Sequence, residues 1–168
     1  MNKGILLVLS GYLMWGCFPL YWALLNHVNP SEVLIHRMLW AVPVLFFLVH
    51  FKSSWKNNFK DSISSKKELV FLFITAILIT INWGGYIYAV NLGRVVEASM
   101  GYFLSPVINM IGGYIFFQER ISKLKQLAVF FATVGALYYV FSGDSFPWLG
   151  FLVGFTFSAY GIARKAMA

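Results

Sequence analysis

The stretch VEASMGYFLSP, residues 96–106, decides the fold because it puts polar groups into an otherwise apolar part of the chain. It contains a carboxylate at Glu97, a phenol at Tyr102, a hydroxyl at Ser105 and a helix-breaking proline at Pro106. The flanking stretches are apolar enough to lie in lipid. Lipid tails offer no hydrogen bonds, so these polar groups must face protein or water. The stretch therefore predicts a membrane-spanning helix with one face turned away from lipid.

The composition of the whole chain also indicates a membrane protein. Its 168 residues are 60% hydrophobic and 11% charged, and the mean hydropathy is +0.72. A soluble domain carries about 25% charged residues. The formal net charge of +7 fits the Lys- and Arg-rich cytoplasmic loops of membrane proteins better than a nucleic-acid partner. The single cysteine, Cys17, excludes a disulfide or a zinc-binding CxxC within the chain. We expect no metal and no cofactor.

Six apolar runs are long enough to span a bilayer as helices. Each has ~18–23 residues, or roughly 27–35 Å of helix at ~1.5 Å per residue. They predict an all-α, polytopic helical bundle of about six transmembrane helices. The expected spans are 5–25, 33–51, 69–91, 95–117, 124–142 and 146–163.

The basic residues predict the orientation. All Lys and Arg residues except Arg37 and Arg94 lie on one side of the expected spans. Cytoplasmic loops are rich in these residues, so both termini are expected in the cytoplasm. The same bias disfavours an antiparallel dimer, whereas a parallel homodimer stays open. In the long loop, aromatic or aliphatic residues recur every fourth position from Phe51 to Ile63, as in an interfacial amphipathic helix; a solvated basic linker is the alternative.

Five charged or titratable residues are expected at one depth near the outer face: Glu32, His36, Arg37, Arg94 and Glu97. One interpretation is an outer gate or pairing network, with Arg37 to Glu97 as the expected contact. The other is that their side chains simply reach the water interface. Glu97 is the one acid inside a span, so a role in proton coupling is a secondary hypothesis.

Deeper positions suggest a cavity. In the fourth span, Tyr102, Ser105 and Asn109 fall at helical spacing on one face. Pro106 removes a backbone hydrogen bond there and should kink or widen the helix. We predict a substrate cavity lined by Asn82, Trp83, Tyr86, Tyr102, Ser105 and Pro106. Asn109 is instead expected to pack as a hydrogen-bonding strut. Aromatics and breakers from Gly11 to Pro19 fit either a cavity wall or close packing.

Motifs for chemistry are lacking, whereas motifs for helix packing are present. The sequence has no HExxH, GxSxG or Walker loop, so we do not expect an enzyme. GFLVG, residues 150–154, is a GxxxG motif of the kind that brings membrane helices close together. Two functions stay open: a secondary transporter of a small organic molecule, and a non-transporting membrane scaffold or subunit. A scaffold would need no water-facing polar stripe.

The run from Glu97 to Val140 resembles the signature of EamA-type transporters in the drug/metabolite transporter superfamily. It shares a mid-helix proline, a Glu119–Arg120 pair closing the fourth span, and a fifth span rich in Gly and Ala. The stretches SEVLIHRMLW and NWGGYIYAVN, together with VEASMGYFLSP, narrow the resemblance to one branch of that family.

The resemblance implies a ten-helix carrier of the inner membrane, built from two five-helix repeats of inverted topology. Residues 1–142 would then form the first repeat, and 143–168 would begin the second with one helix. The chain would be a fragment of a longer carrier, or a half that must pair with its missing second half. Glu119 and Arg120 would pin the cytoplasmic end of the fourth helix beside the Lys-rich loop. Partners would be a small-molecule substrate and the lipid bilayer.

Overall fold

The computed structural model describes residues 3–51, 65–143 and 145–167, and within these ranges it is all-α, as predicted. No strand occurs in the described ranges. The helices are α1 (Lys3–Leu24), α2 (Pro30–Phe51), α4 (Lys66–Asn91), α5 (Val95–Phe117), α6 (Lys123–Ser142) and α7 (Trp148–Met167). Their ends lie within a few residues of the expected spans. Apart from Phe51, the segment expected to form an interfacial helix lies outside the described residues.

Five of these helices, α1, α2, α4, α5 and α6, are long and apolar enough to cross a membrane. Their outward faces carry many exposed large apolar side chains, such as Leu7, Phe46, Phe73 and Phe131, which suits a surface solvated by lipid. The fold is therefore that of a polytopic helical membrane protein.

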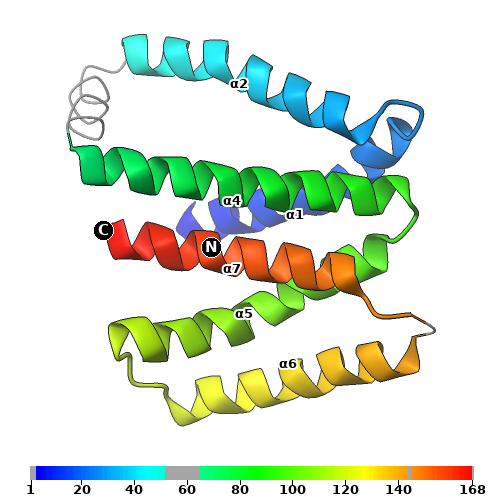
Figure 1. Cartoon of the computed structure of the whole chain (residues 1–168), viewed down its shortest axis with the longest axis vertical. Helices are drawn as coiled ribbons and strands as arrows, with labels where there is room; N and C mark the ends of the chain where they lie inside the picture. Colours follow the sequence, from blue (N-terminus) through cyan, green and yellow to red (C-terminus); the bar gives the residue numbers. More distant parts are fainter. Residues whose placement is uncertain (1–2, 52–64, 144, 168) are drawn as a thin grey trace.

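The remaining helix, α7, has the length of a span but is not among these five, and it lies in the middle of the bundle. Figure 1 shows it between α4 and α5, with α2 beyond α4 and α6 beyond α5. It packs most extensively against those two helices. A helix that is covered by other helices does not need an apolar surface on every side, so α7 can contain polar residues such as Thr156 and Ser158.

Glycines set the distance between α5 and α7. A Cβ atom added to Gly154 would lie 2.7 Å from the carbonyl oxygen of Gly101, and one added to Gly150 would lie 2.5 Å from the carbonyl oxygen of Glu97. Contacts this short do not occur for real Cβ atoms, so the two backbones approach closely only because these residues are glycine. The packing role expected for the GFLVG motif is confirmed.

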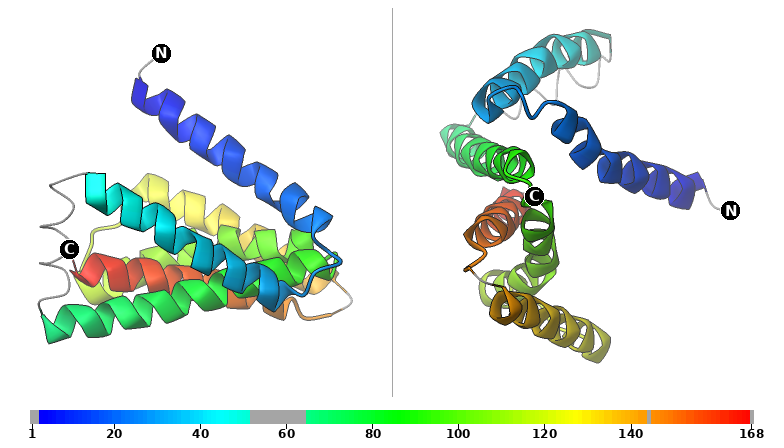
Figure 2. Two further views of the ribbon diagram at one scale, coloured as in Figure 1. Left: turned by 90° about the horizontal axis from the view of Figure 1, so that it is seen from above. Right: turned by 90° about the vertical axis from the view of Figure 1, so that its right-hand side faces the viewer.

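The first helix diverges from the others. Figure 2 shows α1 leaning away from the bundle towards its amino-terminal end. Only Trp22, near its carboxyl end, is buried, and it packs in a cluster with Val33, Ile87 and Val90 that joins α1, α2 and α4. Added Cβ atoms on Gly11 and Gly16 would meet nothing within 4 Å. This divergence leaves space between α1 and the rest of the bundle.

Candidate substrate cavity

A cavity of about 570 Å³ lies between α1, α2, α4, α5 and α7. This is within the size range of small-molecule binding sites, about 300–1,000 Å³. Most of the lining is aromatic, with a few polar groups among the rings. The lining residues are Tyr12, Trp15, Gly16, Phe18, Pro19, Trp22, Arg37, Trp83, Tyr86, Ser99, Tyr102, Ser105, Pro106, Asn109 and Phe157.

The structure places five of the six predicted cavity residues at this cavity: Trp83, Tyr86, Tyr102, Ser105 and Pro106. The rings form a connected group, in which the ring centroid of Tyr102 lies 5.8 Å from that of Tyr86 and 5.4 Å from that of Phe157. Such centroid separations are those of favourable offset and edge-to-face ring pairs. The group fixes the ring of Tyr102 at the centre of the wall.

Asn82 does not line the cavity, contrary to the sequence prediction. Its side chain is fully buried, and its amide nitrogen donates to the carbonyl oxygen of Val153 at 2.7 Å and to the hydroxyl of Thr156 at 3.2 Å. The prediction failed because α7 packs on that face of α4. Asn82 is thus a hydrogen-bonding strut between the two helices, with its carbonyl oxygen accepting from the Tyr102 hydroxyl at 3.5 Å.

The opposite error was made for Asn109. Its side chain is exposed at the cavity rather than packed as a strut. It continues the stripe of Tyr102 and Ser105 along α5, so the helical spacing itself was the signal. The hydroxyl of Ser105 donates to the carbonyl oxygen of Gly101 at 3.2 Å, which leaves Asn109 as the freer polar group at this end of the cavity.

Arg37 brings a positive charge to the cavity wall. Its guanidinium carbon lies 3.8 Å from the ring centroid of Trp83 and 5.6 Å from that of Trp22. These are cation–π distances, and they place the guanidinium over the ring of Trp83 on the aromatic wall. His36 is its neighbour in the sequence, but its side chain is exposed and it does not line the cavity.

The expected contact between Arg37 and Glu97 does not form. The oxygen Oε2 of Glu97 instead pairs with Nη2 of Arg94 at 2.6 Å, because Arg94 precedes Glu97 by three residues and so lies beside it. Arg37 comes from α2, which packs against α4 rather than α5. Four of the residues predicted as one outer group therefore separate into a cavity arginine, an exposed histidine and a local ion pair.

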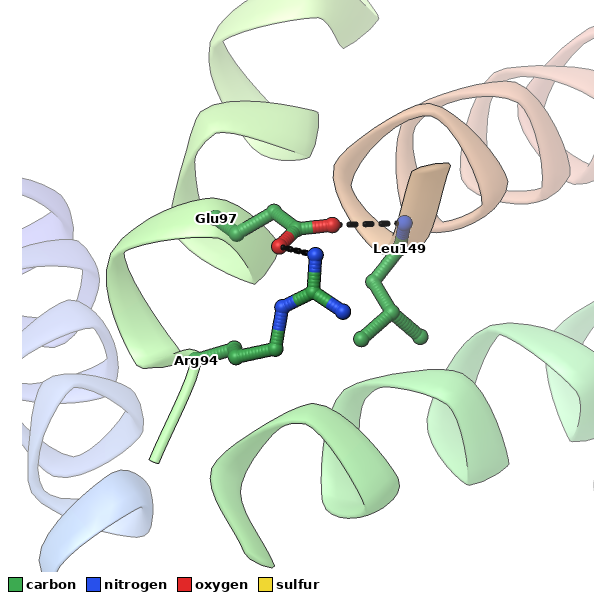
Figure 3. A network of polar contacts seen from close by, with 3 residues as sticks. All are labelled: Arg94, Glu97 and Leu149. Carbon is green, nitrogen blue, oxygen red and sulfur yellow. Dashed lines mark hydrogen bonds and ion pairs between the residues drawn. The ribbon is translucent and has the colours of Figure 1, made fainter. Parts of the chain in front are cut away.

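The carboxylate of Glu97 also holds the start of α7 (Figure 3). Its second oxygen, Oε1, accepts from the backbone N–H of Leu149 at 2.8 Å. The first N–H groups of a helix lack intrahelical partners, and α7 has no acidic residue in its own first turn. Glu97, with 4% of its surface exposed, supplies that acceptor from α5. This bond ties α5 to α7 at one end, while the local ion pair with Arg94 occupies the other oxygen of the carboxylate.

A second pair ties the same helices at the other end. The carboxylate of Glu119 accepts from Nζ of Lys165, and that hydrogen bond and charge lower the pKa of Glu119 below its usual value. Lys165 also lies 4.7 Å from the ring centroid of Phe117. Arg120 was expected to hold this helix end together with Glu119, but its side chain is exposed. Lys165 of α7 is the ion-pair partner of Glu119 instead.

Several lining residues were missed or left undecided by the sequence. Trp22, Ser99 and Phe157 were not predicted, and Trp15 was left between cavity wall and packing. No periodic signal marks the α1 residues, because that helix is apolar on every side.

In the described part of the chain, no group of three His, Cys, Asp or Glu side chains could hold a metal ion.

Comparison with known proteins identifies the relatives of this chain. Residues 2–141 match the model of the EamA-like transporter family. The chain is 36% identical to the uncharacterized transporter YojE of Bacillus subtilis over 98% of its length. It is 35% identical to the protein RarD of Escherichia coli over 99% of its length, and 29% identical to the chloramphenicol-sensitive protein RarD of Pseudomonas aeruginosa. In all three cases it covers only 56% of the relative. No solved structure matches it.

Proposed function

This chain belongs to the EamA-like transporter family, and from that premise we propose that it forms one wall of the substrate path of a secondary transporter. The transporter moves a small organic metabolite or drug across the bacterial inner membrane by alternating access. The resemblance inferred from the sequence is confirmed at the level of the family and of its RarD branch. The substrate and the mechanism are proposals.

The observation that carries the proposal is the cavity between the diverging α1 and the helices α2, α4, α5 and α7. It combines aromatic walls with a few polar groups, the usual composition of small-molecule sites. Its wall on α5 contains Pro106 and the stripe of Tyr102, Ser105 and Asn109. In carriers built from inverted repeats, the substrate site lies near the bilayer midplane between the repeats.

The remaining wall belongs, in this proposal, to a second half that packs against α1. The chain spans about half the length of the relatives it matches. Residues 1–142 would be the first five-helix repeat, and 143–168 the beginning of the second. In this proposal both ends of the chain lie in the cytoplasm, which the Lys and Arg residues on that side support. A parallel homodimer is the alternative source of the second wall.

Cysteine accessibility tests whether the cavity is wet. In a Cys17→Ser background, Ser99→Cys and Asn109→Cys should react with a membrane-impermeant thiol reagent, because both side chains line the cavity. Ser158→Cys is the matched control, since Ser158 is fully buried. His27→Cys, in the exposed turn after α1, should react in every case.

A membrane scaffold without a transport path predicts a different result. Its polar side chains would pack against protein, so Ser99→Cys and Asn109→Cys would stay unlabelled, like Ser158→Cys, while His27→Cys reacts. That outcome would reject the proposed transport path.

A further inference from the structure

The cavity contains one formally charged side chain, Arg37, among fifteen lining residues. A charged group inside a membrane span is costly unless it has a partner or water. The described residues form two ion pairs, which join Arg94 to Glu97 and Lys165 to Glu119. Neither involves Arg37, so no carboxylate in the described part of the chain neutralises its guanidinium.

Arg37 lines the cavity, and its donors are not fully enclosed by protein. The only fully buried side-chain nitrogen or oxygen without a partner in the described ranges belongs to Glu68, so the nitrogens of Arg37 are not shut in against apolar protein. A guanidinium has five N–H donors in its plane. The guanidinium carbon lies over the ring of Trp83 at 3.8 Å, and this contact occupies no N–H donor, so the donors remain available to a ligand.

The surroundings of this edge suit an aromatic body beside the charge. Trp83 and Trp22 hold the guanidinium, and the linked rings of Tyr86, Tyr102 and Phe157 continue the wall. We propose that the cavity takes a small organic anion, with its carboxylate in the fork of Arg37 and a flat apolar body against these rings. Arginine binds carboxylates through two parallel hydrogen bonds, and such charge-assisted bonds are the stronger kind.

This assignment rests on the proposed transport function and narrows its substrate class. An arginine lies on the cavity wall, whereas the carboxylates of Glu97 and Glu119 pair with other cations. An organic cation in the same cavity would be repelled by Arg37, and no acidic group lies among the lining residues to offset that charge.

Three probes with one aromatic body test the charge directly: 3-phenylpropionate, 3-phenylpropanamide and 3-phenylpropylamine. Binding is measured by tryptophan fluorescence in phosphatidylcholine nanodiscs. Arg37→Gln is titrated in parallel so that partition of the probes into lipid cancels. The anion should bind about tenfold or more tightly than the amide, the ratio expected of one charge-assisted hydrogen-bonded pair. Arg37→Gln should abolish this preference, and Arg37→Lys should restore part of it. Arg164→Gln, an exposed charge at the end of α7, should keep it.

Contrary outcomes are distinct from failure of the transport proposal. Equal binding of anion and amide, or tighter binding of the amine, would overturn the anion assignment and leave a binding cavity in place. Binding of none of the probes would contradict both proposals. Loss of the anion preference in the chain joined to its second half would show that an acid there neutralises Arg37, and would also overturn the assignment. Displacement of the anion by soluble dihexanoyl-phosphatidylglycerol at lower concentrations than the probe itself requires would identify a lipid phosphate, not a substrate, as the occupant.

Discussion

Glu97 should contribute to stability through the link between α5 and the start of α7, and its removal gives the sharpest prediction. Its carboxylate forms an ion pair with Arg94 through Oε2 and accepts a hydrogen bond from the Leu149 N–H through Oε1, so both oxygens are used. Hydrogen bonds to charged groups contribute about 1.5–3 kcal/mol each, and Arg94 keeps 32% of its side chain exposed, which reduces its share. We expect Glu97→Ala to lower the free energy of unfolding by about 3 kcal/mol.

The Gln variant separates charge from hydrogen bonding. Glu97→Gln keeps an oxygen for the Leu149 N–H but loses the ion pair, so it should cost about 1–2 kcal/mol. Both variants are compared with wild type by reversible unfolding in mixed detergent micelles. Glu119→Gln is the control, because it removes a carboxylate from the exposed pair at the opposite end of the same two helices and should change stability little. A Glu97→Ala cost no larger than that of Glu119→Gln would refute this account of Glu97.

Three further predictions concern packing and pH. Gly154→Ala should lower the free energy of unfolding by about 1–3 kcal/mol, because its Cβ would meet α5. Gly16→Ala, which has open space around it, should be neutral or slightly stabilising. Unfolding curves compare the two variants, and equal effects would count against the close approach of α5 and α7. Asn82→Ala should lower the free energy of unfolding by about 1 kcal/mol, as for interhelical hydrogen bonds in membrane proteins generally. Asn82→Cys should resist thiol labelling, and rapid labelling would show that position 82 lines the cavity after all. The pKa of Glu119 is lowered by Lys165, so the ion pair is intact at neutral pH and is lost as the pH falls through that lowered pKa. In a carboxyl NMR titration, the titration midpoint of Glu119 should be higher in Lys165→Met than in the wild type. An unchanged midpoint would show that the pair does not form.

The sequence predicted the helices well because lipid imposes a simple length and polarity rule. It also predicted most of the cavity wall on α5, since Tyr102, Ser105 and Pro106 lie at helical spacing in one stretch. Pairings between helices were less predictable. Asn82 and Arg37 each have a polar or aromatic partner on another helix, and which helix lies opposite depends on the packing of the whole bundle. The central place of α7 could not be derived from its own composition.

The most direct test of alternating access is the side from which the cavity can be reached. Ser99→Cys, in the Cys17→Ser background and in the chain joined to its proposed second half, is labelled with an impermeant thiol reagent in right-side-out and in inside-out membrane vesicles. The proposed carrier exposes Ser99 on the cavity wall to each side in turn, so labelling should occur in both kinds of vesicle. A bound substrate or inhibitor should slow it. Labelling from one side alone, at a rate that no ligand changes, would contradict the account.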